Sequence, residues 1–145
     1  MERMYRREQF SEQITGEQQI FCEVVQMGND YTLCVWGGDT PHVGSVVMSV
    51  AGPGLNSADV SVTSSVINGI GHKDELVARK FAEAVAKRKN CTAVCTCGIH
   101  IDNITKEQLL AVETAGERLL EKILNLILSG YGIEIEKGDR ISIDR

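Results

Sequence analysis

The chain has 145 residues and a mass of 15.9 kDa, which suits a single domain. Its 43% hydrophobic and 24% charged residues exclude a disordered protein, and its net charge of −5 argues against broad, non-specific nucleic-acid binding. No apolar run approaches the roughly 20 residues that span a bilayer, and the charged start of the chain lacks the apolar core of a secretory signal. We therefore expect a cytoplasmic protein that does not bind membranes.

The first half of the chain predicts four strands. Residues 1–17 are polar, and we expect them to form a tail or lead-in to one domain over residues 18–145. The predicted strands are rich in β-branched and aromatic side chains, and Gly28-Asn29-Asp30 between the first two indicates a hairpin. In the fourth, Val60, Val62 and Ser64 lie on one face and alternate with polar residues. These strands cover residues 20–27, 31–36, 45–50 and 59–66.

The second half predicts a helix, a strand and a longer helix. Apolar residues at helical spacing indicate a helix over 74–89. Residues 91–97 indicate a buried strand, and the small side chains on one of its faces require a helix packed closely against it. Thr105 and Gln108 fit a capping box for a helix that ends near Ser129, before Gly130 and Gly132. Residues 133–143 are compatible with a final hairpin, so the order β-β-β-β-α-β-α indicates an α+β domain.

Glycine and charge are unevenly distributed. Seven of the 14 glycines and both prolines fall between positions 37 and 71, and no Lys or Arg occurs between Arg7 and Lys73. Pro53, between Gly52 and Gly54, indicates either a plain connection, which we favour, or a lid over a ligand. We interpret the glycine-rich segment as the rim of a ligand site.

The stretch from Gly69 to Lys73 is a candidate anion site. Its Gly69-Ile70-Gly71 turn enters a predicted helix, and His72 and Lys73 follow directly. Glycines let backbone N–H groups converge, and a helix N-terminus favours a phosphate. The spacing is not that of a Walker loop or of a dinucleotide-binding fingerprint, so an ordinary strand-to-helix turn with a solvated Lys73 is the alternative.

Three histidines occupy predicted loops. His42, His72 and His100 each have an Asp or Asn within three residues. If the loops share one end of the sheet, the histidines converge, and they would bind either a divalent metal or an anionic or aromatic ligand. Because no closely spaced pair of histidines fixes a metal geometry, we assign no metal; unrelated surface histidines remain the third interpretation. The neighbouring residues are Asp39 for His42, Asp74 for His72, and Asp102 and Asn103 for His100.

The cysteines and the last helix carry weaker signals. The five cysteines lie in apolar runs and indicate reduced, buried thiols, with Cys97 the one placed to reach a site. The helix after Thr105 is unusually apolar in its second half, which indicates either deep burial or a dimer interface. Gly116 in mid-helix predicts a close backbone contact.

Three stretches together resemble the small prenylated-flavin chaperones, the LpdD-like group of gallate-decarboxylase accessory proteins. The most specific is Gly98-Ile-His100-Ile-Asp102-Asn103-Ile-Thr105, and the other two occur in the right order. They are Gly37-Gly-Asp-Thr-Pro-His42-Val-Gly44 and Gly71-His72-Lys73-Asp74-Glu75. The resemblance covers roughly residues 18–130. It implies a fold similar to that of proteasome assembly chaperones: a mostly antiparallel sheet with two helices packed on one face.

The resemblance also implies a function. Such proteins are not enzymes themselves; they are thought to bind prenylated FMN and deliver it to a UbiD-type aromatic-acid (de)carboxylase. The phosphate would lie at Gly71, His72 and Lys73, and the ring would meet the other motif residues. Those residues are His42, Gly98, His100, Asp102 and Asn103. We expect a homodimeric accessory protein; the alternatives are a small metal-dependent enzyme that uses the three histidines and a protein-assembly chaperone without a small-molecule ligand.

Overall fold

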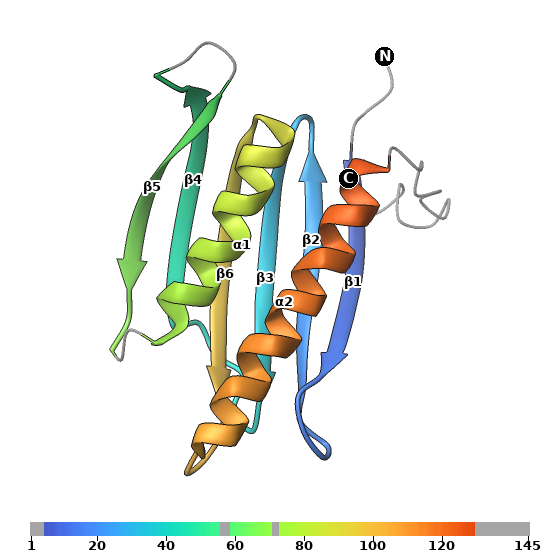
Figure 1. Ribbon diagram of the computed structural model, residues 1–145, viewed down its shortest axis with the longest axis vertical. Helices are drawn as coiled ribbons and strands as arrows, with labels where there is room; N and C mark the ends of the chain where they lie inside the picture. Colours follow the sequence, from blue (N-terminus) through green and yellow to red (C-terminus); the bar gives the residue numbers. More distant parts are fainter. Residues whose placement is uncertain (1–4, 56–58, 71–72, 130–145) are drawn as a thin grey trace, which may run out of the picture.

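The described part of the chain forms one sheet and two helices (Figure 1). The computed structural model describes residues 5–55, 59–70 and 73–129. Six strands form one sheet in the order β1-β2-β3-β6-β4-β5, and within it β3 and β6 form the parallel pair while the other neighbours are antiparallel. The predicted α+β architecture is confirmed. The elements are β1 (Tyr5–Gln13), β2 (Gln19–Met27), β3 (Asp30–Gly38), β4 (Ser45–Pro53), β5 (Val60–Asn68), α1 (Lys73–Lys89), β6 (Thr92–His100) and α2 (Lys106–Leu128).

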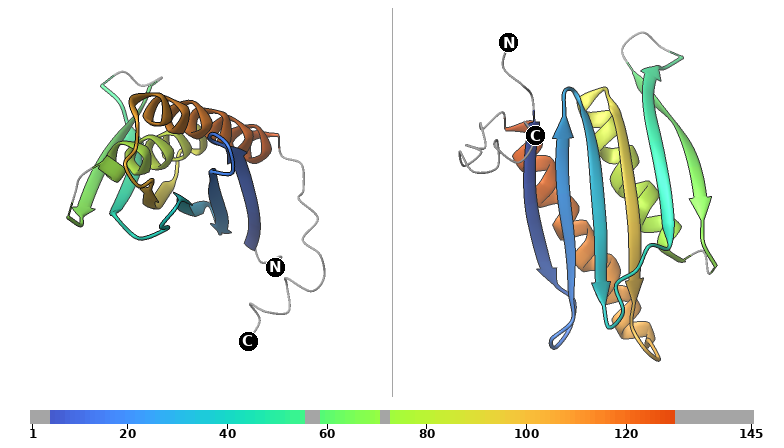
Figure 2. Two further views of the ribbon diagram at one scale, coloured as in Figure 1. Left: turned by 90° about the horizontal axis from the view of Figure 1, so that it is seen from below. Right: turned by 180° about the vertical axis from the view of Figure 1, so that it is seen from behind.

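Both helices cover the same face of the sheet, and the core lies between them and the strands (Figures 1 and 2). The predicted small face of β6 is confirmed, because Ala93, Cys95 and Cys97 are fully buried. They meet α1, whose own buried face includes Ala78 and Ala82 beside Phe81. Small side chains on both elements let this helix approach the sheet closely.

The N-terminal strand differs from the sequence prediction. Tyr5–Gln13 forms β1 and pairs with β2 along its whole length, whereas the sequence predicts a tail or lead-in here. β1 is an edge strand, and its partners on α2 are polar: Lys122 lies 2.7 Å from Glu12, and Arg118 lies 3.4 Å from it. These cations lower the pKa of Glu12, with Lys122 the larger cause.

The second helix begins as predicted. Thr105 is its N-cap, and the capping box with Gln108 is present. Leu119 and Ile123 are fully buried, so much of its apolar second half lies within the chain's own core, while Leu128 stays 43% exposed. The close contact expected at Gly116 is absent, since a Cβ at that position would meet nothing within 4 Å.

The glycine-proline segment after the third predicted strand does not border the histidine loops. Gly52 and Pro53 continue β4 and pair with Ser61 and Val60, and Gly54 donates its N–H to Asp59. This hairpin lies at the end of the sheet opposite the connection between β3 and β4 (Figure 1), which removes the lid interpretation. The hairpin predicted over 133–143 lies outside the described residues. Among the helices that the structure describes, none has both the length and the apolar character to cross a membrane.

Candidate functional site

Two histidine loops and the start of α1 converge at one end of the sheet (Figure 2). The register explains this: Gly38 pairs with His100 at the ends of the parallel strands β3 and β6, and Ser45 pairs with both Cys97 and Asn68. The connections after β3, β5 and β6 therefore all leave from the same edge. The predicted convergence is confirmed for the loops that carry His42 and His100.

Asp74 holds these connections together. It lies in the first turn of α1 and is only 7% exposed. One carboxylate oxygen, Oδ1, accepts the backbone N–H of Ile99 at 3.0 Å, and Oδ2 lies 3.1 Å from Nε2 of His42. A single carboxylate thus joins the N-terminus of α1, the end of β6 and the loop between β3 and β4.

Both ring nitrogens of His42 have a partner. Nδ1 lies 3.1 Å from the carbonyl oxygen of Thr40, and Nε2 faces the carboxylate of Asp74. Both partners are acceptors, a carbonyl oxygen on one side of the ring and a carboxylate on the other. The side chain remains 40% exposed. His42 therefore lies at the N-terminus of α1 with its ring held in place, inside the long segment without Lys or Arg.

His100 belongs to a second polar group. Its Nε2 lies 2.9 Å from Asp102 Oδ1, and the backbone N–H of Asp102 donates to Asp39 Oδ2 at 2.8 Å. The Asp102 N–H and the amide of Gln18 lower the pKa of Asp39, in that order. Asn103 next in the chain has a left-handed backbone with φ +52°. The group fixes the loop after β6 against the loop after β3 and leaves His100 exposed.

Glycine permits the close approach of these loops. A Cβ at Gly98 would overlap the carbonyl oxygen of His42, and one at Gly44 would overlap the carboxylate of Asp74. Gly38 has φ +79°, and a Cβ there would overlap the carbonyl oxygen of His100. The glycines at this end of the sheet therefore have a packing role, and Gly98 acts through the space it leaves for the His42 loop.

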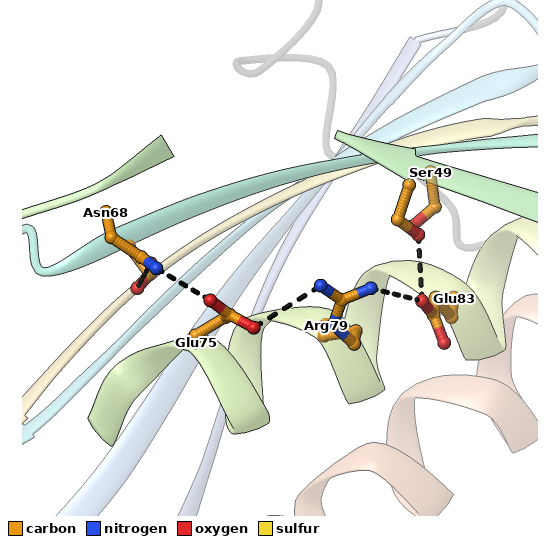
Figure 3. Close-up of polar contacts among 7 residues, drawn as sticks. Ser49, Asn68, Glu75, Arg79 and Glu83 are labelled. Carbon is orange, nitrogen blue, oxygen red and sulfur yellow. Dashed lines mark hydrogen bonds and ion pairs between the residues drawn. The ribbon is translucent and has the colours of Figure 1, made fainter. Parts of the chain in front are cut away.

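A chain of polar contacts fixes α1 against β4 and β5 (Figure 3). Asn68 donates to Glu75 at 2.6 Å, and Arg79 bonds both Glu75 and Glu83 at 3.3 and 3.2 Å. Glu83 in turn accepts from Ser64 at 2.8 Å. Because Asn68 ends β5 and Glu75 lies in the first turn of α1, the network joins the end of that strand to the start of the helix.

The structure describes most of the predicted site residues but not all of them. Gly71 and His72 lie outside the described residues, and Lys73 is the first residue of α1. The expected pairing of His100 with Asp102 is confirmed. The other expected neighbours are exchanged, since Asp74 pairs with His42, and Asp39 binds the loop of His100. Sequence distance did not reveal these partners, because they lie 32 and 63 positions apart.

Within the described residues, the buried cysteines form no reactive thiol site, and the possible metal ligands form no metal site. Cys97 is fully buried, and burial, followed by the nearby Asp74, raises its pKa, so this thiol is unreactive. Cys34 corrects the prediction of buried thiols, because it is exposed. Across residues 5–55, 59–70 and 73–129, no group of three or more His, Cys, Asp or Glu side chains is arranged to hold a metal ion.

A separate groove lies between the two helices. It has a volume of about 530 Å³, and its apolar lining includes Val77, Phe81 and Val112. Leu76 at its border is 72% exposed, and Gly116 leaves its floor open.

The sequence matches the family model of the prenylated flavin chaperone LpdD-like domain over residues 14–128. The chain belongs to this family. A relative, protein LpdD of Lactiplantibacillus plantarum, is 27% identical over 127 residues, which cover 88% of each chain. Membership in a chaperone family supports an accessory role for this protein.

The fold is shared with a solved structure of a different kind. The crystal structure of a novel chaperone complex for yeast 20S proteasome assembly contains a chain that superposes with a TM-score of 0.53. Sequence identity is 16%, and the match covers 87% of this chain and 98% of that one. At this identity the comparison establishes the fold, which agrees with the proteasome-assembly-chaperone-like architecture expected from the sequence.

Proposed function

We propose that this protein is a non-catalytic chaperone that binds prenylated FMN and delivers it to a UbiD-type aromatic-acid (de)carboxylase. The observation that carries the proposal is the convergence of the His42 and His100 loops at the N-terminus of α1 in a member of the prenylated-flavin chaperone family. The flavin is a cargo here, and the chemistry that it performs belongs to the decarboxylase. We propose that the chaperone acts as a homodimer in the cytoplasm. Its five free thiols favour this reducing compartment.

The donors at this end of the sheet fit a flavin phosphate. The N-terminus of a helix attracts anions, and the imidazole of His42 lies beside it. Asp74 places a carboxylate at the same point, so a bound phosphate depends on a cation nearby. Lys73, at the first position of α1, is our choice for it, together with Gly71 and His72.

The ring would lie against the second polar group. His100 is exposed and held by Asp102, and Asn103 adds an amide to the same loop. Imidazole and amide groups match the carbonyl oxygens and ring nitrogens of an isoalloxazine. Most of these groups are exposed, which suits a carrier that must release its cargo.

Binding is tested by mixing the purified protein with prenylated FMN and desalting the mixture. We expect the flavin absorbance to remain with the protein, and the loaded protein to activate an apo-decarboxylase. Riboflavin, which has the ring without the phosphate, should bind at least about 10-fold more weakly than FMN if the phosphate is recognised. The proposal fails if no flavin is retained and no decarboxylase is activated.

Lys73→Ala tests the position of the phosphate. Loss of one charge-assisted hydrogen bond costs about 1.5–3 kcal/mol, so affinity for FMN should fall roughly 10- to 150-fold. Lys89→Ala is the matched control, because Lys89 is an exposed lysine at the other end of α1. Equal affinities of the two variants would show that the phosphate lies elsewhere.

An assembly chaperone without a small-molecule ligand is the second candidate. The groove between α1 and α2 favours it, because an open apolar surface on the helix layer suits a protein partner. Activation of the decarboxylase without flavin retention would support this candidate over the first.

A further inference from the structure

Among the residues that the structure describes, no helix covers one face of the sheet (Figure 2, right). Strand alternation directs every second side chain of each strand to this open face. In antiparallel sheets with one free face, that face is usually polar. Here it has an unusual share of apolar side chains, with Met48 43% and Ile67 72% exposed and Phe21 stacked on Trp36 at 5.5 Å. Val94 of β6 pairs with Met48, and Val25 of β2 lies in the same row of the register, opposite Thr32.

The open face is nearly free of net charge. β2 to β6 contain no Lys or Arg, and the acidic side chains that these strands direct to the open face are Glu23 and Asp30. Both are bonded within the chain: Arg7 of β1 lies 3.7 Å from Glu23, and Asp30 accepts the backbone N–H of Thr92 at 2.9 Å. The remaining polar side chains of the face are mainly Thr and Ser, which are easily buried when hydrogen-bonded.

The size of the face matches a stable interface. Six strands of nine residues, about 4.8 Å apart and rising about 3.3 Å per residue, cover roughly 24 by 30 Å. That is about 700 Å² for one protein, or about 1,400 Å² for two facing copies. Specific interfaces bury about 1,200–2,000 Å² in total.

We propose that the open face is the interface of a homodimer, in which the sheets of two copies pack against each other with the helices outside. A two-fold axis pairs the surface with a copy of itself, so a face with a large net charge would meet a face of the same sign. The near-neutral open face avoids this repulsion, whereas a partner selected by charge would find little to recognise. Sheets packed in this way lie about 10 Å apart, with strands crossing at about 30°.

This inference rests on the homodimer in the proposed function and assigns it a surface, without depending on flavin binding. It also differs from the sequence interpretation, in which α2 is the candidate dimer surface. The exposed leucines of α2 are Leu109 and Leu110 at its N-terminal end and Leu128 at its C-terminal end, and all three lie outside the open face.

Cys34 reports on the interface in the unmodified protein. It lies on β3 in the middle of the open face, and it is the exposed cysteine, whereas Cys22, Cys91, Cys95 and Cys97 are buried. We expect a dimer by sedimentation and light scattering. Ellman's reagent should modify Cys34 at least about 10-fold more slowly in the dimer than in diluted, monomeric protein, because reactivity follows thiol exposure.

Met48→Arg tests the same surface by substitution. Met48 is partly exposed in one protomer, so the monomer should still fold, which circular dichroism checks. Each dimer would bury two unpaired charges, and we expect the dissociation constant to rise at least about 100-fold and Cys34 to react rapidly. Leu110→Arg, an exposed apolar residue on α2, is the matched control and should leave the dimer intact.

The outcomes separate the proposals. A monomer at all concentrations overturns both the homodimer and its surface but leaves flavin binding to its own assay. A dimer whose Cys34 reacts as fast as in the diluted protein overturns the surface alone, as does dissociation by Leu110→Arg and not by Met48→Arg. The Cys34 measurement on the unmodified protein decides the matter even if Met48→Arg fails to fold.

Discussion

Asp74 is the residue whose removal should most disturb the candidate site. Asp74→Ala removes the acceptor of the partly buried Ile99 N–H, which costs about 1.5–3 kcal/mol. It also removes the contact with the half-exposed His42, worth up to about 1 kcal/mol, and a favourable charge near the start of α1, worth about 0.5 kcal/mol. We therefore expect a loss of about 3 kcal/mol, a large part of the 5–15 kcal/mol that stabilises a typical domain.

Asp74→Asn separates these contributions. Its side-chain oxygen still accepts from Ile99, so the expected loss is about 1 kcal/mol. Glu107→Ala, which removes an exposed acidic residue from the first turn of α2, should cost no more than about 0.5 kcal/mol. The free energy of unfolding of all three variants is measured by urea unfolding, followed by the fluorescence of Trp36 at one fixed protein concentration. If Asp74→Ala cost under about 1 kcal/mol, or no more than Asp74→Asn, the described role of Asp74 would be refuted.

Three further predictions concern packing, capping and pH. Gly98→Ala should cost about 2 kcal/mol or more in urea unfolding, because its methyl group overlaps the His42 carbonyl, whereas Gly52→Ala has open space and should be nearly neutral. Thr105→Ala should cost about 1 kcal/mol by the same measurement, through loss of the N-cap. Burial raises the pKa of Cys91 to about 11 from 9.0, so the unfolded state loses this proton first. Stability should therefore fall as the pH rises from about 9 to 11, and less so in Cys91→Ala; equal slopes in thermal melts would contradict this.

Local signals predicted most of the elements. The alternation in residues 59–66, the small face of β6 and the capping box at Thr105 each follow from chemistry within a few positions. β1 was missed because its helix-facing side carries Glu8 and Glu12 beside Phe10, so no apolar period marks it. Its pairing is supplied by β2, and its contact with α2 is an ion pair; neither is visible in the segment alone.

The plain connection favoured at Pro53 is confirmed, whereas counting Gly52 and Gly54 in the ligand rim is wrong for a different physical reason. Glycine and proline correctly marked a chain reversal, but they do not show at which end of the sheet the reversal lies. Chain direction alternates along an antiparallel sheet, so the turn after β4 lies opposite the connection that precedes it. Counting strand directions would have separated Gly52 and Gly54 from Gly38 and Gly44, although their local sequences look alike.

The side-chain partners of His42 and Asp39 could not be predicted from the local sequence. Asp74 and His42 meet because β4 lies between β5 and β6, which brings the start of α1 against the loop after β3. That strand order depends on the parallel pairing of β3 with β6, a long-range contact without a local signal. Sequence proximity instead suggested Asp39 for His42, and the structure gives that carboxylate to the Asp102 backbone.

The fold offers a second explanation for the long segment without Lys or Arg. Residues 8–72 hold β2 to β5, and about half of their strand positions face the core, where cations are not expected in any protein. The other half face away from the helices, on a face that is usually polar in antiparallel sheets. β5 is also an edge strand of nine residues without a charge. Sequence analysis linked the segment to a ligand rim, but a rim accounts only for its last few positions. An open face that is covered by a second copy accounts for the strands themselves.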